Sequence, residues 1–399
     1  MTGYELYLLI YNIIMSAKIK ILQVIPKLGF GGAETGCYDL AHFLAEQNCK
    51  SFLITSGGEL LKYVRRDKVK VIRLPVQSKN PVTILFNFVI IFFILWIYKI
   101  DIVHARSRAP AWSCLWACFF SRKKFVTTFH GTYNFSSQLK HFYNSVMVRS
   151  KLIIGGSNFI FGHINENYQK YFNAKKQKLM VIFRGINLEF FNEKNVSEKK
   201  VNMLTSSWKI DKKNFIILLP GRLTRWKGQE IFIEALNLLV EDFNNENFHA
   251  IILGSHQGRD VYNKKLLLLV EQYRLRKKIS FIENCKEMPL AYKLSDLVVS
   301  SSIEPEAFGR VAVEAQAMNK PIVASDIGGS RETVLNGRSG LLYKFNNPKE
   351  LAKAINKIIK MDKQSLNLMG ELGRQNVEKK YNVDQMCQTT FTEYKKLLK

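Results

Sequence analysis

A chain of 399 residues, 47% of them hydrophobic, is too long for one typical globular core and predicts two domains. Its six cysteines are scattered without a C-x-x-C pair, which argues against a disulfide scaffold and for a reduced, cytoplasmic protein. The formal net charge of +26 indicates an anionic partner, yet no zinc-finger, homeodomain or RNP pattern points to nucleic acid.

The first segment, residues 4–15, is apolar. It lacks a basic start, contains Glu5 and ends without a small-residue cleavage site, so a signal peptide is not expected. Translation from Met15 and a short extension that touches a membrane both stay open.

Residues 20–26 are then expected to form a strand, followed by a glycine-rich turn and a helical pattern through Leu44. Gly31 and Gly32 in this turn would let an anion approach the helix N-terminus, where free N–H groups favour negative charge. Glu34 stands where a dinucleotide fingerprint needs its third glycine, so a nicotinamide cofactor is not expected. Glu34 is interpreted instead as a helix cap or an acceptor contact.

Residues 81–98 are apolar enough to be read, by hydropathy alone, as a membrane span of about 18 residues. They lie, however, between strands expected at 71–74 and 102–105, and a span would put these strands on opposite sides of a bilayer. We therefore expect a helix on the flank of a sheet, whose outer face meets lipid or another protein. Trp96, Tyr98 and Lys99 at its end suit an interface. A helix buried in the core is the alternative.

The strand expected over 125–129 ends in His130 and Gly131. A single histidine is usually structural. This one stands at the carboxyl end of a strand, where ligands bind to open α/β sheets, so His130 is a candidate functional residue.

Residues 220–228 connect a strand expected over 215–219 to an amphipathic segment over 231–240. Their order is not that of a P-loop. Arg222 and Lys227 nevertheless place two cations near the start of a helix, a pair that suits a diphosphate. A solvated surface loop is the alternative.

The most informative stretch, residues 304–315, follows a buried strand expected over 297–300. Glu306 should lie in the loop at the carboxyl end of that strand, and Glu314 inside the following helix. The two carboxylates indicate one acid for a sugar and one for a ribose, with free backbone N–H groups between them for phosphate.

Short apolar runs alternate with helical segments along the chain, which predicts an α/β fold with parallel sheets. The polar run 192–200 is the expected linker, so the domains are predicted over 1–195 and 196–376. Besides those named above, strands are expected at 52–55, 152–155, 180–183, 250–253, 279–282, 321–324 and 341–343.

Taken together, these motifs resemble the family 4 retaining glycosyltransferases, which have the GT-B fold of two Rossmann-like, doubly wound domains facing across a cleft. The resemblance runs from about Ile19 to Tyr381, and it implies that residues 377–399 pack back on the first domain. The run 101–112, with 143–147, resembles a bacterial branch that assembles lipopolysaccharide core or capsule. The matching motifs are Gly31-Gly32-Ala33-Glu34, His130-Gly131, Gly221-Arg222, Lys227-Gly228, Glu306 with Glu314, Asp326-Ile327-Gly328-Gly329 with Glu332, and Arg184-Gly185-Ile186-Asn187 with Phe190.

The resemblance also implies a role for each matching residue. The implied catalytic residues are His130 beside the reacting sugar, Arg222 and Lys227 on the donor diphosphate, and Glu306 on the donor sugar. Donor contacts are implied for Gly31, Gly32, Phe308, Gly309, Arg310 and Glu314, and acceptor contacts are assigned to Glu34, Arg106 and Arg108. Two positions depart from the family pattern: Arg184 replaces a usual Asn, and Arg310 a usual aliphatic residue.

The implied activity is metal-independent, retaining transfer of a hexose, with mannose favoured, from a UDP- or GDP-sugar to a lipid-linked glycan in lipopolysaccharide core or surface polysaccharide assembly. The nucleotide sugar is a substrate, and no cofactor is expected. No metal site is expected either, because the chain lacks an Asp-x-Asp element after a strand and its seven histidines form no ligand cluster. A nucleotide-sugar epimerase of the same architecture and a non-catalytic sugar-nucleotide-binding protein are the alternatives.

The basic surface favours an anionic membrane leaflet as a partner, which would place the protein on the inner face of the cytoplasmic membrane. The alternative is a lysine-rich but merely solvated surface. Candidate membrane-facing cations of the first domain are Lys62, Arg65, Arg66, Lys68, Lys70, Arg122, Lys123, Lys124, Lys140 and Arg149.

Overall fold

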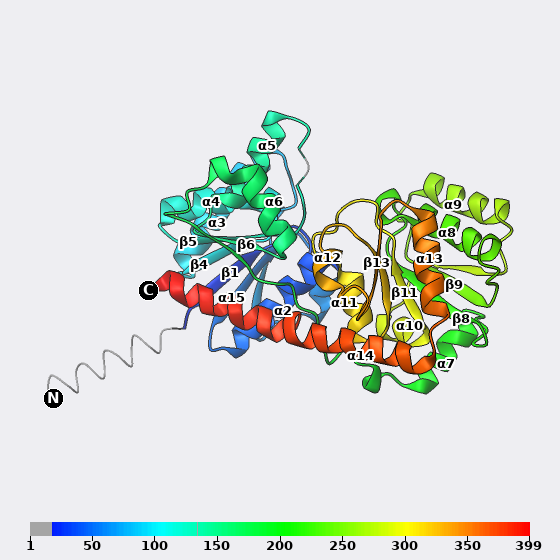
Figure 1. The fold of residues 1–399 in the computed structure, drawn as a ribbon. Coiled ribbons are helices and arrows are strands. Elements are labelled where there is room, and N and C mark those ends of the chain that lie inside the picture. The colour runs from blue at the N-terminus through cyan, green and yellow to red at the C-terminus, as the bar shows by residue number, and fades with distance from the viewer. Residues whose placement is uncertain (1–17, 134) are drawn as a thin grey trace. The chain divides into compact units, whose positions relative to one another are not determined.

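The computed structural model describes residues 18–133 and 135–399, so the apolar segment 4–15 lies outside the described residues. The chain forms two compact units (Figure 1). The first unit consists of the chain up to Phe183 together with the C-terminal segment Val383–Lys399. The second unit is Arg184–Asn382. This division falls earlier in the chain than the one predicted between residues 195 and 196, and the chain returns to the first unit later than residue 377.

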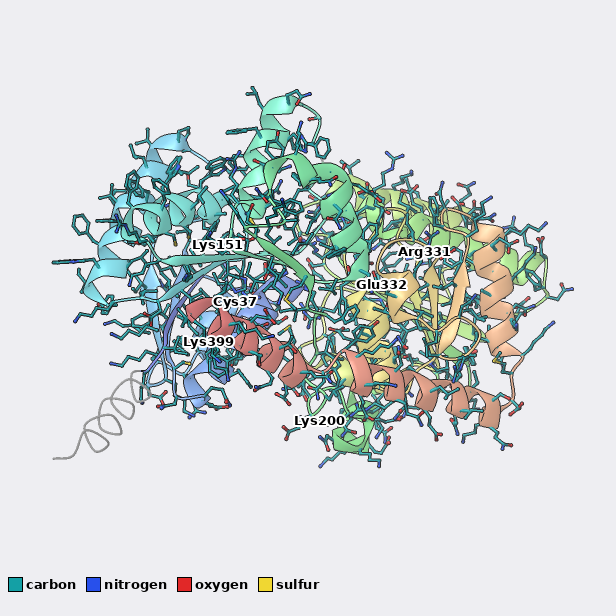
Figure 2. The ribbon with its side chains drawn as sticks, turned by 60° about the vertical axis from the view of Figure 1, so that its left-hand side comes forward. Cys37, Lys151, Lys200, Arg331, Glu332 and Lys399 are labelled. Atoms are coloured by element: carbon teal, nitrogen blue, oxygen red, sulfur yellow. The ribbon has the colours of Figure 1, made fainter. Side chains whose placement is uncertain are left out.

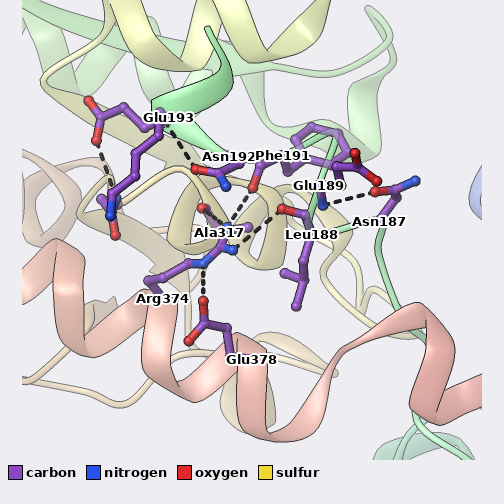
Figure 3. Close-up of polar contacts among 11 residues, drawn as sticks. Asn187, Leu188, Glu189, Phe191, Asn192, Glu193, Ala317, Arg374 and Glu378 are labelled. Atoms are coloured by element: carbon purple, nitrogen blue, oxygen red, sulfur yellow. Dashed lines mark hydrogen bonds and ion pairs between the residues drawn. The ribbon is translucent and has the colours of Figure 1, made fainter.

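The segment 184–195 belongs to the second unit because it is fastened to α14 (Lys363–Lys380). The guanidinium of Arg374 donates to the carbonyl oxygens of Phe191 at 2.6 Å and Leu188 at 3.4 Å. It also donates to the carbonyl of Ala317 at 2.7 Å and pairs with Glu378 (Figure 3). The linker was expected at the polar run 192–200, but all of this run belongs to the second unit. The carbonyls of Leu188 and Phe191, just before the run, accept hydrogen bonds from the mostly buried cation of Arg374.

The first unit is built on a seven-stranded, all-parallel sheet in the order β3-β2-β1-β4-β5-β6-β7. Most residues of its central strands are buried, and the majority of these are apolar, as expected for a sheet that is covered on both faces. Their bounds are β1 (Lys20–Val24), β2 (Lys50–Thr55), β3 (Val69–Arg73), β4 (Ile102–Ala105), β5 (Lys124–Phe129), β6 (Leu152–Gly155) and β7 (Lys178–Val181).

Helices cover both faces of this sheet. The C-terminal helix α15 packs against α2 on one face, and α3 packs against α4 on the other (Figure 1). Cys37, labelled in Figure 2, lies in the core on the inner side of α2. The helices are α2 (Gly32–Glu46), α3 (Pro81–Ile97), α4 (Arg108–Ser121), α5 (Gln138–Asn144), α6 (Asn158–Tyr168) and α15 (Val383–Leu398).

The apolar run 81–98 forms α3, a helix on the flank of the first sheet as predicted. Asn80 caps its start by accepting a hydrogen bond from the backbone N–H of Val82 at 2.9 Å, and Pro81 takes the first turn. The flanking strands β3 and β4 belong to one sheet. Among the described residues, no helix combines the length and apolarity that a bilayer crossing requires.

The second unit contains a six-stranded, all-parallel sheet in the order β10-β9-β8-β11-β12-β13. Its main core lies between the sheet and α8, α9 and α13, where Phe232, Leu236, Ile252 and Ile355 are almost wholly buried. The strands are β8 (Phe215–Pro220), β9 (Phe248–Leu253), β10 (Ile279–Ile282), β11 (Leu297–Ser300), β12 (Ile322–Ser325) and β13 (Gly340–Tyr343).

The remaining helices of the second unit hold the loops that carry the candidate motifs. Among them, α11 packs against α14, and α7 against α10. The helices are α7 (Glu198–Ser207), α8 (Gln229–Glu241), α9 (Asp260–Gln272), α10 (Met288–Leu294), α11 (Arg310–Ala317), α12 (Ser330–Thr333) and α13 (Pro348–Ile359), together with α14.

Candidate functional site

The two strongest motifs of the second unit come together at one point of its sheet. Strands β8 and β11 are neighbours, and the strand order reverses between them. The segment 221–228 leaves the carboxyl end of β8, and the segment 301–309 leaves the carboxyl end of β11. The crevice outside such a reversal point is where open α/β sheets bind their ligands.

Lys227 and Glu306 form an ion pair across these two segments. The Nζ of Lys227 donates to Oε1 of Glu306 at 2.7 Å, and the side chains are only 14% and 10% exposed. The hydroxyl of Ser302 donates to the same carboxylate oxygen. The Lys227 ammonium also lies 4.4 Å from the ring centre of Trp226. The sequence singled out both charges but gave no sign that they pair, because 79 residues separate them.

The environment of Glu306 keeps its carboxyl group ionised. Burial alone would raise the pKa of Glu306, but the charge of Lys227 and hydrogen bonds from Lys227, Ser302 and Ser300 outweigh burial and lower it. The site therefore holds an ionised carboxylate paired with the Lys227 side chain, and both are largely shielded from solvent. Such a pair can accept a hydrogen bond from a hydroxyl and donate one to an anionic oxygen.

Glycines allow these segments to approach each other closely. Gly228 has a φ of +70°, and a Cβ at this position would collide with the carbonyl oxygen of Ser301. Gly328, with a φ of +60°, would place a Cβ 2.6 Å from the carbonyl oxygen of Glu306. The backbone N–H of Gly329 donates to that same carbonyl at 2.8 Å. The Gly328-Gly329 turn thus packs directly against the backbone of the loop that carries Glu306 and holds this loop by a hydrogen bond.

Glu314 lies inside α11, as the spacing predicted, and both of its carboxylate oxygens are occupied. Oε2 accepts from the hydroxyl of Tyr292 at 2.7 Å, and Oε1 accepts from Nε of Arg310 one turn earlier in the helix. Burial, and then the neighbouring Glu314 carboxylate, raise the pKa of Tyr292 far above its usual range, so Tyr292 stays a donor. Tyr292 was missed by the sequence analysis, since a tyrosine within α10 carries no motif.

The other predicted residues of this unit have different settings. The side chain of Arg222 is exposed and forms no ion pair within residues 18–133 and 135–399. Phe308 is buried, with its ring edge-on to Tyr381 at 5.4 Å, so only its backbone faces the loop. Gly309, with a φ of +79°, turns the chain into α11. Glu332, labelled in Figure 2, accepts at its backbone carbonyl from the Tyr381 hydroxyl at 2.8 Å.

In the first unit, the glycine-rich turn also ends at a reversal point of strand order, between β1 and β4. Gly31 precedes α2, and Gly32 is its first residue. The carboxylate of Glu34 folds back over Gly31 in the first turn of the helix. This position suits the predicted helix-capping role, because a carboxylate there faces the positive end of the helix dipole.

Three more predicted residues follow the carboxyl ends of β4 and β5, which are neighbours. Arg106 is buried and donates from Nε to Oε1 of Gln23 on β1 at 2.8 Å. Arg108 donates to Oδ1 of Asn144 at 2.8 Å, and its guanidinium lies 4.2 Å from the ring centre of Tyr133. His130 is the first residue after β5 and is half-buried. All of these residues stand on the same edge of the first sheet as the Gly31-Gly32 turn.

The described part of the chain contains no group of three or more His, Cys, Asp or Glu side chains arranged to hold a metal ion. Its six cysteines are all free thiols.

Known proteins resemble both units of the chain. Residues 30–190 match the family model described as Glycosyltransferase Family 4, and residues 201–376 match Glycosyl transferases group 1. An uncharacterized glycosyltransferase of Methanocaldococcus jannaschii is 27% identical over 95% of this chain and 98% of its own. A crystal structure of a glycosyltransferase from Rickettsia africae ESF-5 is 34% identical, covers 96% of this chain and 99% of its own, and superposes with a TM-score of 0.87.

A third similar structure has a ligand in its title. The Anabaena protein HepE, solved in complex with UDP-glucose, has a TM-score of 0.80 with 23% identity, over 95% of this chain and all of its own. At this identity the likeness shows a shared fold of two Rossmann-like domains.

Proposed function

Since the chain belongs to glycosyltransferase family 4 and has the GT-B fold, we propose that it moves a hexose from a nucleotide-diphospho-sugar to a lipid-linked glycan, with retention of configuration and without a metal. The observation that carries the proposal is the buried pair of Lys227 and Glu306 at the reversal point of the second sheet. Glu306 would hold hydroxyls of the donor sugar, and Lys227 would neutralise the diphosphate.

The charges fit the transfer step. When the bond between the sugar C1 and the phosphate oxygen breaks, negative charge grows on the departing diphosphate. Lys227 and Arg222 both lie in the segment 221–228 that leads into α8, and cations placed there stabilise such developing charge. The acceptor oxygen bonds to C1 on the same face, and its proton passes to the departing phosphate oxygen. No nucleophilic side chain is needed for this route.

Glu314 suits the ribose of the donor. Its carboxylate is held by Tyr292 and Arg310, and each oxygen keeps a second lone pair that could accept from a ribose hydroxyl. The roles assigned to Gly31, Gly32, Phe308, Gly309 and His130 are part of the same proposal. The proposal also assigns contacts with the acceptor to Glu34, Arg106 and Arg108.

A UDP-hexose is the first donor to test, because the Anabaena protein of the same fold was crystallised with UDP-glucose. GDP-mannose is the second, because of the resemblance to lipopolysaccharide-core enzymes. The proposed setting is lipopolysaccharide core or surface polysaccharide assembly at the inner face of the cytoplasmic membrane.

The test is to incubate the protein with UDP-glucose or GDP-mannose and a lipid-extracted glycan acceptor, then measure the released nucleotide and the anomeric proton coupling of the product. We expect transfer that survives EDTA and a product with the donor's anomeric configuration. An inverted product, or activity only after a metal is restored, would contradict the retaining, metal-independent mechanism.

The donor alone separates the alternatives. An epimerase would convert the nucleotide sugar without an acceptor, and a binding protein would show ligand-dependent thermal stabilisation with no product from any acceptor. A transferase releases nucleotide slowly without an acceptor and rapidly with one.

A further inference from the structure

We propose that the outer face of α3, together with the exposed end of α4, docks on an anionic lipid bilayer. As an account of how the enzyme meets a lipid-linked acceptor, this inference rests on the proposed function. As a lipid-binding surface, it rests only on the first unit, and its test requires no sugar transfer.

The helix α3 is apolar on the side where a surface helix is normally polar. Its inner face, with Ile84, Ile91 and Leu95, is buried, and α3 packs against α4. The opposite face is exposed, yet none of the 17 residues of α3 carries a charge. The exposed positions repeat at helical spacing and are Val82, Leu85, Phe86, Val89, Phe93, Trp96 and Ile97, with Trp96 73% exposed.

The apolar surface continues onto α4. The ring of Phe88 on α3 lies 5.7 Å from that of Phe120 and 6.1 Å from that of Trp116 on α4. Phe119, next to Phe120, is 75% exposed. Single exposed apolar residues need no explanation, but a continuous surface of this kind on two adjacent helices marks an interaction site.

This surface cannot be a membrane span. The strands that flank α3 are held in one sheet: β3 pairs with β2, β2 with β1, and β1 with β4. With its inner face packed on α4, α3 can only lie in the plane of an interface, with its apolar side toward the acyl chains.

The charges around this surface select an anionic partner. Lys99 follows α3, and Arg122, Lys123 and Lys124 follow α4. The two helix ends are joined, because the backbone N–H of Lys124 donates to the carbonyl of Asp101 at 3.3 Å. Asp101 is the only acid between residues 79 and 124, and its carboxylate already accepts from the backbone N–H of Lys20.

A bilayer fits these features better than a second copy of the chain. Two copies that met through this face would bring two cationic rims together, each on a protein of net charge +26. Anionic headgroups would instead pair with the rim, at roughly 1 kcal/mol per basic residue near the surface, while the apolar side enters the acyl boundary. Trp96 at the helix end has the amphipathic side chain preferred at that depth.

The test is flotation of the full chain with vesicles of two parts phosphatidylcholine to one part phosphatidylglycerol. We expect the parent protein to float with these vesicles, and the triple variant Phe86→Gln, Phe93→Gln and Trp96→Gln to lose about tenfold or more in partitioning, because it removes large exposed apolar side chains. The matched control is Val261→Gln, Leu268→Gln and Leu368→Gln, which removes three exposed apolar residues of the second unit. The control should float like the parent.

A second arm tests the rim. The variant Arg122→Gln, Lys123→Gln and Lys124→Gln should weaken binding to the anionic vesicles and make it less sensitive to salt. Brominated lipid should quench the tryptophan fluorescence of the parent protein, because the exposed ring of Trp96 reaches the acyl boundary. This quenching should fall when Trp96 is replaced by Phe.

Either of two results would overturn the inference. One is equal flotation of the parent and the α3 triple variant while circular dichroism shows both folded. The other is a dimer, seen by sedimentation velocity, that the α3 variant converts to a monomer, since that would make the face an interface between copies. Donor turnover measured in detergent without vesicles reports on the proposed function separately.

Discussion

The hydroxyl of Tyr292 donates to Oε2 of Glu314 over 2.7 Å, and both side chains are buried. This bond joins α10 to α11 and leaves the Glu314 carboxylate with one fixed donor on each oxygen. A buried carboxylate needs such partners, because an unpaired one would lose solvation without compensation. The orientation of Glu314 therefore depends on a residue outside the motif that contains it.

The substitution Tyr292→Phe removes this hydrogen bond and leaves the ring in place. We expect the KM for the nucleotide sugar to rise roughly tenfold or more with little change in kcat, since a hydrogen bond to a charged group contributes about 1.5–3 kcal/mol. Steady-state kinetics would check this. Tyr343→Phe is the matched control, because it removes a buried hydroxyl bonded to Ser325 and leaves Glu314 untouched. Equal effects of both substitutions would contradict a specific role for Tyr292.

The buried pair of Lys227 and Glu306 predicts different outcomes for stability and turnover. Lys227→Met should lower kcat by roughly a hundredfold or more, as loss of one preorganised charge typically does. It should also destabilise the fold, because Glu306 is left buried and unpaired. Adding Glu306→Gln should restore much of the stability, measured by urea unfolding, but none of the turnover.

The exposed pair of Lys265 and Glu230 supplies the comparison. Lys265→Met removes a cation from the same unit and should change both quantities little. If the double variant recovered turnover along with stability, the lysine would be structural and would have no part in the reaction.

The close approach at Gly228 predicts a steric penalty that can be separated from backbone strain. Gly228→Ala combines a positive φ with a collision against the Ser301 carbonyl, and it should cost several kcal/mol, more than the roughly 1–3 kcal/mol of strain alone. Gly258→Ala has a φ of +76° but open space around its Cβ, so it shows the strain alone. Thermal unfolding of the two variants would measure the difference, and equal losses would contradict the steric account.

His104 makes the first unit sensitive to acid. It is buried between the hydroxyls of Tyr394 and Thr128, the latter at 2.7 Å, and burial, followed by the nearby Arg106 charge, lowers its pKa well below 6.5. The unfolded chain takes up this proton near pH 6.5, whereas the folded chain resists it. The contribution of neutral, buried His104 to the free energy of unfolding is therefore fully present above about pH 6.5. It is lost as the pH falls toward the lowered pKa of His104. Urea unfolding from pH 7.5 to 5 should show a smaller loss for His104→Gln than for the parent.

The fold could be predicted largely from sequence, because strands buried on both faces appear as continuous apolar runs. Examples are β8 and β11, whose neighbouring positions brought Lys227 and Glu306 to one edge. Topology thus accounts for which motifs share an edge.

The details inside that edge could not be predicted. The contacts of Tyr292 with Glu314 and of Arg310 with Glu314 depend on how helices pack, and no spacing rule fixes the partner of a tyrosine on another helix. The division of the chain was also out of reach. The polar run 192–200 looks like a linker by composition, but the whole run belongs to the second unit, and Arg374, far along the chain, binds the backbone just before it.

The position of α3 between strands of one sheet also constrains the order of events during synthesis. The 17 residues of α3, none of them charged, emerge from the ribosome before β4 does, and β4 must pair with β1, which lies before α3 in the chain. Until that pairing forms, both faces of α3 are uncovered, and the nascent chain resembles one that carries a short membrane segment. Early pairing of β1 with β4 is therefore required for α3 to fold into the first unit. Substitutions that delay this pairing, such as a polar residue in place of Val103, should direct newly made protein toward aggregation.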